Sequence, residues 1–278
     1  MMTNPWNLLD PDTLRDPQEQ TCRLTRQPAE EGMRTLADAS IDLVIADPPY
    51  DIGVAKWDTL DLDTARVWLT ECVRCLRPGG ALLLYGSPCR TWIARMTLLL
   101  VDTLGMNHVQ DLAWVYTQGG DARMSTMKDY AVRHERLVWF ERPPRGTQQR
   151  TFHPQCAAEH YTDDERAIAL AKGKHRVTLE SLNNGRPPRT FIDIPRENSR
   201  SKEHEYGKHP SMKPLLLCDR LIRVHSNRGD SVLIPFAGSG SELLTATKLG
   251  RRAIGFETEE AYVALMKRRF QGHGLPSV

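Results

Sequence analysis

The chain has 278 residues, of which 40% are hydrophobic and 26% charged, with a formal net charge of +2 at pH 7. This length suits one large α/β domain with an insertion, or two smaller domains, and the composition is that of a globular protein. The apolar runs are too short for a membrane-spanning helix, and the N-terminus lacks the pattern of a signal peptide. We therefore expect a cytoplasmic protein without a membrane partner.

Residues 1–40 are polar, show little periodicity and predict a lead-in with a short helix. Residues 41–46 form an almost continuous apolar run, which is typical of a strand buried on both faces. Helical spacing follows over residues 62–76, and Gly79 and Gly80 stand where a helix cap is expected. The pattern then predicts a strand, a helix and two further strands, at residues 81–86, 91–105, 109–116 and 135–142.

From about residue 143 to 208, prolines, glycines and charges replace this regular pattern. One amphipathic piece, residues 162–174, opens with Thr162 as a plausible N-cap. Regular alternation then returns as a helix, a strand, a helix, a strand and a final helix, at residues 213–226, 230–236, 239–250, 251–257 and 259–270. Strands that alternate with helices predict a mostly parallel, doubly wound sheet with helices on both faces.

Positive charge is concentrated in the irregular part of the chain. Residues 142–213 contain 14 Lys and Arg against 9 Asp and Glu, whereas the rest has 23 against 26. A basic insertion in a slightly acidic body suggests a polyanion partner on one side, but a solvated surface has the same composition.

The cysteines and histidines give little sign of a metal site. Cys72 and Cys75 form a CxxC inside a helical pattern, without a second CxxC at zinc spacing, which favours two thiols on one helix. A set of His153, Cys156 and His160 lacks a convincing fourth zinc ligand. We therefore expect no metal.

The segment PFAGSGSE, residues 235–242, follows a strand and opens a helix. Gly238 and Gly240 permit a tight turn with backbone N–H groups exposed at a helix N-terminus. Glu257 ends the next strand, where an acidic side chain is placed to bind ribose hydroxyls. Leu243 replaces the third glycine of GxGxxG, so a nucleoside cofactor is favoured over a dinucleotide.

The segment Asp47-Pro48-Pro49-Tyr50 leaves the end of the first predicted strand. Consecutive prolines fix φ and leave no N–H to be satisfied, so their carbonyls are free to face a ligand. A carboxylate, such carbonyls and an aromatic ring together suit a flat molecule with an exocyclic NH2 group. Two acceptors bind its two N–H groups by hydrogen bonds, and Tyr50 stacks on its face.

These motifs resemble those of the amino-methylating, S-adenosylmethionine-dependent DNA methyltransferases. DPPY is similar to their catalytic motif and FAGSG to their FxGxG cofactor motif, while residues 209–214, HPSMKP, resemble the HPxxKP element of the β subgroup. Trp114 and the later His134-Glu135 are similar to that subgroup's W…HE segment. The order, with the catalytic motif first, then an insertion and then the cofactor motif, is the permuted β arrangement.

The resemblance implies a Rossmann-like methyltransferase fold with permuted motif order, in which residues 1–142 and 206–278 form the catalytic domain and 143–205 a target-recognition insertion. The implied catalytic residues are Asp47, Pro48, Pro49 and Tyr50. The implied residues of the S-adenosyl-L-methionine site are Asp47, Lys213, Phe236, Ala237, Gly238, Ser239, Gly240 and Glu257.

The implied reaction is site-specific methylation of adenine N6 in double-stranded DNA, with the target base flipped out of the helix. Most basic side chains of the insertion should touch phosphate, and Trp57 either packs beside the flipped base or fills the core. The predicted DNA-binding residues are Trp57, Arg186, Arg189, Arg196 and Arg200. The resemblance also implies a homodimer and a nucleoid-associated location.

The chain departs from the family at two positions, because Ile234 stands where an Asp is usual and Ser241 where Thr is common. Cytosine-N4 methylation remains an alternative, although members with that activity more often carry Ser at the position of Asp47. Relatives that modify side-chain amides or RNA tend to have Asn there. Further alternatives are a catalytically silent DNA-binding protein on the same fold and a nicotinamide dehydrogenase, for which DPPY has no role.

Overall fold

A computed structural model describes residues 21–53, 55–116, 128, 130–159, 161–162, 164–165, 167–168, 179–197, 201–276 and 278. Its centre is an eight-stranded sheet with the order β1-β8-β7-β2-β3-β5-β4-β6. The strands are β1 (Cys22–Arg26), β2 (Ile41–Ala46), β3 (Leu76–Gly86), β4 (Asn107–Val115), β5 (His134–Glu141), β6 (Phe191–Asp193), β7 (Ser231–Ile234) and β8 (Arg252–Glu257). Only β5 runs antiparallel to its neighbours among these strands, which confirms the predicted fold class.

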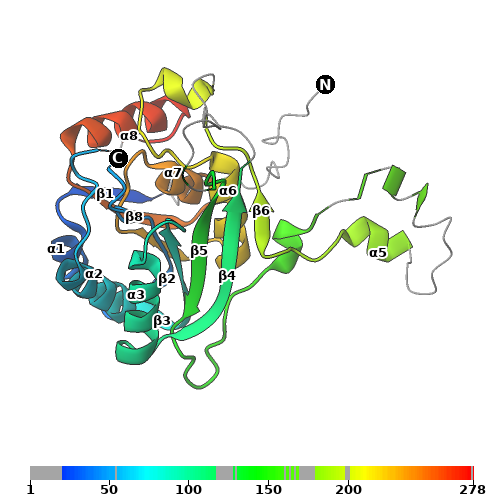
Figure 1. The fold of residues 1–278 in the computed structure, drawn as a ribbon, viewed down its shortest axis with the longest axis horizontal. Coiled ribbons are helices and arrows are strands. Elements are labelled where there is room, and N and C mark those ends of the chain that lie inside the picture. Colours follow the sequence, from blue (N-terminus) through cyan, green and yellow to red (C-terminus); the bar gives the residue numbers. More distant parts are fainter. Residues whose placement is uncertain are drawn as a thin grey trace.

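Helices cover both faces of the sheet (Figure 1). One face packs against α1 (Ala29–Met33), α2 (Leu62–Cys75) and α3 (Trp92–Leu98), and the other against α6 (Leu215–His225), α7 (Ser241–Lys248) and α8 (Glu260–Gly272). The remaining named helices are short: η3 (Leu99–Thr103), η5 (Pro154–Ala157), α5 (Leu179–Asn184) and η6 (Lys202–Glu205).

The packing of the central strand β2 explains why its sequence is almost continuously apolar. Leu43 and Ile45 belong to the core on the side of α6 and α7, whereas Val44 and Ala46 belong to the core on the side of α2. Alternate side chains of a strand point to opposite faces, so a strand covered on both sides needs apolar residues at every position.

Three expectations about local structure need correction. The first is the lead-in, which contains an edge strand, β1, paired with β8, besides the expected short helix α1. The second is the helix expected over residues 91–105, which changes to π-helical geometry at Leu99. The helix expected over residues 162–174 is not among these corrections, because most of its residues lie outside the described part of the chain.

The third correction concerns Gly79 and Gly80, which do not cap α2. The helix ends at Cys75, and the chain enters β3 directly at Leu76. Gly79 has a φ of +74° inside this strand, where the pairing with β2 shifts register, and a Cβ there would lie 2.9 Å from the carbonyl oxygen of Gln149. These glycines permit a distorted strand and the close approach of residues 149–150.

Cys72 and Cys75 lie buried on α2, and all six cysteines are free thiols. In the part of the chain that the structure describes, no helix is long and apolar enough to cross a membrane.

Part of the predicted insertion is integrated into the body of the molecule. Strand β6 pairs with β4, and the indole Nε1 of Trp114 donates to the carbonyl of Ile194 at 2.7 Å. Phe152 stacks on Trp139 of β5 with ring centroids 5.2 Å apart. By contrast, Figure 1 shows α5 projecting away from the sheet, beyond β6. The domain boundaries at 143 and 205 stay predictions.

Candidate active site

Five parallel strands end at one edge of the sheet, and the segments that follow them line a single cleft of about 740 Å³. These segments are residues 27–30 after β1, 47–50 after β2, 87–89 after β3, 235–239 after β7 and 256–259 at the end of β8. Open α/β sheets place their ligand sites at this edge. The acidic-proline corner and the glycine turn therefore face one cavity, which also contains Trp57, Arg196 and Lys213. Gly240 is the one predicted cofactor residue outside its lining.

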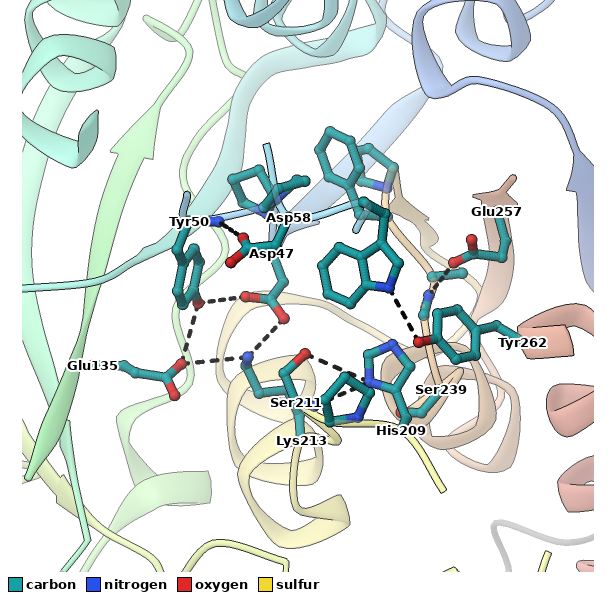
Figure 2. A pocket seen from close by; sticks show the side chains of 18 of the residues that line it. Asp47, Tyr50, Asp58, Glu135, His209, Ser211, Lys213, Ser239, Glu257 and Tyr262 are labelled. Carbon is teal, nitrogen blue, oxygen red and sulfur yellow. Dashed lines mark hydrogen bonds and ion pairs between the residues drawn. The ribbon is translucent and has the colours of Figure 1, made fainter. Parts of the chain in front are cut away.

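Four side chains form a polar cluster at the end of β2 (Figure 2), in which Glu135 and Lys213 are buried and Asp47 and Tyr50 half-buried. The ammonium of Lys213 lies 2.6 Å from Oδ2 of Asp47 and 3.3 Å from Oε2 of Glu135. The hydroxyl of Tyr50 donates to Oδ1 of Asp47 and lies 3.1 Å from Oε2 of Glu135. Both oxygens of Asp47 thus accept hydrogen bonds, one of them from the hydroxyl of Tyr50, whose ring was expected to stack on a substrate.

Burial and charge set the protonation of this cluster. Lys213 is 3% exposed, and burial alone would lower its pKa, but the carboxylates of Asp47 and Glu135 outweigh burial and raise that pKa above its ordinary value. Burial also raises the pKa of Asp47, while the Lys213 ammonium opposes that rise. Lys213 is therefore held as a cation by the two carboxylates, and its charge opposes the protonation of Asp47.

Asp58 organises the loop after the two prolines, a role that sequence reasoning missed. Its carboxylate is 3% exposed and accepts four backbone N–H groups at 2.7–2.9 Å. The donors are those of Tyr50, Asp51, Ile52 and Gly53. Two carboxylate oxygens provide about four acceptor sites, so this side chain is fully used. Nothing in its spacing from Asp47 indicated this role.

We expect Asp58→Ala to reduce turnover about 100-fold, because misplacing Tyr50 and the proline corner by about 1 Å costs that much. Unfolding free energy should fall by at most about 2 kcal/mol, since the freed N–H groups lie in a loop that water can reach. Steady-state rates and urea denaturation check both numbers. Asp61→Ala is the matched control, because Asp61 also accepts backbone N–H groups, but at the start of α2. Normal turnover in Asp58→Ala would contradict this role.

The glycine turn has the conformation that its sequence predicted. Gly238 and Gly240 have φ values of +50° and +77°, and a Cβ on Gly240 would lie 2.5 Å from Cγ of Met266. Oε2 of Glu257 accepts the N–H of Gly238 at 2.7 Å, so the acid that was expected to bind ribose also fixes the turn. Ile234, which stands at the family's usual Asp position, is buried in the core.

Arg269 supports the same turn from α8 and was not anticipated from the sequence. Its fully buried guanidinium donates to the carbonyl of Ser239 at 2.6 Å and pairs with Glu203 at 2.6 Å. Burial raises the pKa of Glu203, but His273 and Arg269 outweigh it and bring that pKa down to about 2. A basic residue in an amphipathic terminal helix normally faces solvent, so the sequence offered no signal for it.

Trp57 lies in the wall of the cleft, between the loop after β2 and α8. Its Nε1 donates to the hydroxyl of Tyr262 at 3.1 Å, and its ring stacks on His209 at 5.9 Å. Burial, with Lys213 and Arg269 adding, lowers the pKa of His209 to about 4, so this imidazole is neutral at pH 7. Trp57 therefore lines the cavity, and its contact with DNA stays a prediction.

The predicted DNA-binding arginines are engaged within the protein. Arg186 pairs with Glu165 at 2.7 Å, Arg189 with Glu159 at 2.6 Å and Arg196 with Glu135 at 3.1 Å. Arg186 and Arg189 lie outside the cleft lining, whereas Arg196 belongs to it and links the predicted insertion to Glu135 of the polar cluster. Arg200 lies outside the described residues.

Within the residues that the structure describes, no group of His, Cys, Asp and Glu side chains is arranged to hold a metal ion. His160, one member of the considered zinc set, lies outside those residues.

Comparison with known proteins identifies relatives over most of the chain. The sequence profile of a DNA methylase family, N6_N4_Mtase, matches residues 41–268. The type II methyltransferase M.HpaI of Haemophilus parainfluenzae is 30% identical over 256 residues, which cover 89% of this chain and 73% of that protein. The DNA adenine methyltransferase YhdJ of Escherichia coli is 27% identical over 85% of this chain and 78% of its own length.

Solved structures share the fold. The cytosine-N4-specific PvuII DNA methyltransferase superposes with a TM-score of 0.65 at 16% identity, covering 90% of this chain and 88% of that one. A DNA modification methylase of Thermus thermophilus in complex with S-adenosyl-L-methionine superposes with a TM-score of 0.59 at 24% identity, covering 91% and 95%.

Proposed function

Because the chain belongs to the N6/N4 DNA methylase family, we propose that it methylates adenine N6 in double-stranded DNA. Its cofactor is S-adenosyl-L-methionine, as in the family and its structurally characterised relatives. The observation that carries the proposal is the shared cleft, in which the Asp47 carboxylate and the glycine turn at Gly238 face one cavity. The permuted, β-type motif order of the DPPY and FAGSG segments is part of the same proposal.

The residues at the glycine-turn end of the cleft fit this cofactor. Glu257 lies beside the turn, and the apolar side chains of Pro28, Ala29, Phe236 and Phe256 line the adjacent wall. Such a wall suits a flat purine, while the carboxylate suits ribose hydroxyls. When bound, the cofactor supplies an electrophilic methyl group on a sulfonium, so the chain need not provide a nucleophile or a metal.

The chain's own task is to present the amine of the target base. An exocyclic amine is a poor nucleophile because its lone pair is delocalised into the ring. Asp47 and the carbonyl of Pro48 would accept hydrogen bonds from its two N–H groups and stabilise the positive charge that develops on nitrogen, before one proton is lost to water through Asp47. Since the Tyr50 hydroxyl now occupies Oδ1 of Asp47, the arriving amine would displace that hydroxyl and free the ring to stack on the base.

Adenine is preferred over cytosine because the first position of the motif is Asp47, whereas members that modify cytosine N4 more often carry Ser. The similarity to the adenine methyltransferase YhdJ supports this choice. The fold of the cytosine-N4-specific PvuII enzyme keeps N4 methylation as a second candidate.

The partner follows from the substrate. A base inside a duplex must be flipped out to reach the cleft, at a cost of a few kcal/mol. We assign duplex contact to the insertion, where Arg186 and Arg189 would exchange their exposed ion pairs for phosphate. Such a protein would act at the nucleoid in the cytoplasm.

Leu62, Val67 and Leu98 on α2 and α3 are exposed apolar side chains that support a homodimer.

The test is to incubate the purified protein with DNA and methyl-labelled cofactor, then digest the DNA and identify the modified nucleoside by mass spectrometry. We expect N6-methyladenine at a defined sequence. N4-methylcytosine would establish the second candidate instead. Label that stays unincorporated at low salt, despite tight cofactor binding, would contradict methyl transfer to DNA.

The rate of methyl transfer should also fall steeply as the salt concentration rises, because contacts with phosphate release counterions from the DNA.

A further inference from the structure

Most carboxylates in the cleft have both oxygens occupied by protein donors. Asp47 is held by Tyr50 and Lys213, and Asp58 by four backbone N–H groups. Glu135 is held by Arg196 on one oxygen and by Tyr50 and Lys213 on the other. Glu257 accepts three backbone N–H groups. Each of these four acids therefore has protein donors on both oxygens, although Asp47 and Glu257 also serve the ligands proposed above.

Glu242 differs from them. It lies in the first turn of α7, directly after the glycine turn, and its side chain lines the cleft while being only 5% exposed. Its Oε1 is buried and has no hydrogen-bond partner among the described residues. A buried carboxylate oxygen without a partner costs free energy, so such an oxygen calls for a donor that the chain itself does not supply.

The electrostatic surroundings of Glu242 favour a cationic donor. Burial, followed by the negative charge of Asp47, raises the pKa of Glu242 to about 7, against the opposing effects of Lys213 and of Arg269, whose own charge is paired with Glu203. Asp47, Glu135 and Glu242 place three carboxylates around the buried Lys213, and Arg196 adds one more positive charge at Glu135. With all acids ionised, the cluster keeps an excess of one negative charge. A bound cation would neutralise this excess negative charge.

We infer that Glu242 binds the α-ammonium group of the cofactor's methionine moiety, an inference that rests on the proposed use of S-adenosyl-L-methionine. The cofactor carries two cationic centres, a sulfonium and an α-ammonium. A sulfonium has no proton to donate, whereas an ammonium has three. Only the ammonium satisfies both the charge and the missing hydrogen bond at Oε1. Glu242 becomes fully ionised when this partner arrives.

The experiment compares three ligands by calorimetry: S-adenosylmethionine, S-adenosylhomocysteine, which keeps the ammonium but lacks the sulfonium, and methylthioadenosine, which lacks both. Glu242→Gln should weaken the first two by about 10- to 100-fold, the effect of losing a charged hydrogen bond, and change the third less than about 2-fold. Glutamine has the shape of the protonated acid, so the variant should fold. Glu31→Gln, an exposed acid on α1, is the matched control and should change none of the three.

Proton release gives a second readout. With a pKa of about 7 in the free protein, Glu242 is about half protonated at pH 7 and should lose that proton on binding. Titrations in buffers of different ionisation enthalpy should show the wild type releasing about half a proton more than Glu242→Gln. The wild-type affinity should therefore tighten as pH rises through 7, relative to the variant.

Several outcomes would overturn the inference. Equal affinities of wild type and Glu242→Gln for all three ligands would remove the ammonium contact. Loss confined to S-adenosylmethionine would point to the sulfonium, and loss extended to methylthioadenosine would indicate a distorted cleft. Failure of the wild type to bind S-adenosylmethionine would overturn the cofactor assignment, and this inference with it.

Discussion

Asp47→Ala is expected to reduce the methyl-transfer rate by at least about 100- to 1000-fold, the usual cost of removing one preorganised group that stabilises developing charge. The carboxylate stands where the amine must be held, and the side chain that replaces it accepts no proton. Single-turnover rates at saturating cofactor measure the chemical step without product release. DNA binding should be unchanged, and cofactor affinity should change far less than the rate.

Two controls make this result specific. Asp102→Ala removes an exposed acid on η3, remote from the cleft, and should leave the rate unchanged. Thermal unfolding should show that Asp47→Ala is folded, since Glu135 remains beside Lys213 at 3.3 Å. A turnover near that of wild type would eliminate Asp47 as the acceptor of the amine proton and, with it, the proposed mechanism.

The fold could be predicted where the pattern of buried residues repeats regularly along the sequence. Strand β2 and helices α2 and α6 lie within a residue or two of their predicted ranges, because burial on both faces or on one helical stripe leaves a periodic trace. Strand β1 was missed because an edge strand of five residues is only half buried. Gly79 was misassigned because the residues that require a glycine there, 149–150, lie far away in the sequence, and Gly80 because a Cβ there would meet Leu76 and Arg77 of the distorted strand.

The site was predictable only where its residues are contiguous in the sequence. DPPY and the glycine turn are local motifs, and each has its geometry built into neighbouring residues. Arg269 acts through Ser239 and Glu203, which folding brings to it from distant parts of the sequence. Asp58 binds backbone N–H groups of nearby residues, and backbone groups leave no trace in the sequence. Lys213 was assigned to cofactor binding from its motif, but its position against two carboxylates appears only in three dimensions.

Lys213→Met is expected to lower the unfolding free energy by about 3–5 kcal/mol, the cost of breaking a buried ion pair by removing one partner. Methionine fills the volume, so the loss comes from charge. It leaves the half-buried Asp47 and the buried Glu135 without their shared cation, and of these two acids Arg196 reaches Glu135. Urea denaturation of the wild type and the variant measures the difference. Methyl transfer should fall as well, because Asp47 would no longer be held as a carboxylate.

The loss of unfolding free energy in Lys213→Met, relative to the wild type, should depend on pH in a defined direction. Burial already raises the pKa of Asp47, and without the ammonium it rises further in the folded state, while the unfolded value stays ordinary. Between these two values the folded variant binds more protons than the unfolded chain, so its stability falls as pH rises. The deficit against wild type should therefore be smaller at pH 5 than at pH 8.

The matched comparisons separate charge from packing. Lys267→Met changes an exposed lysine on α8 and should shift the unfolding free energy by no more than about 0.5 kcal/mol. Adding Glu135→Gln to Lys213→Met removes one of the two stranded carboxylates, so the double variant should lose less stability than the sum of the single variants. A small, pH-independent deficit in Lys213→Met would mean that the two acids are neutralised by protons in the wild type, and that Asp47 is not held ionised for catalysis by this lysine.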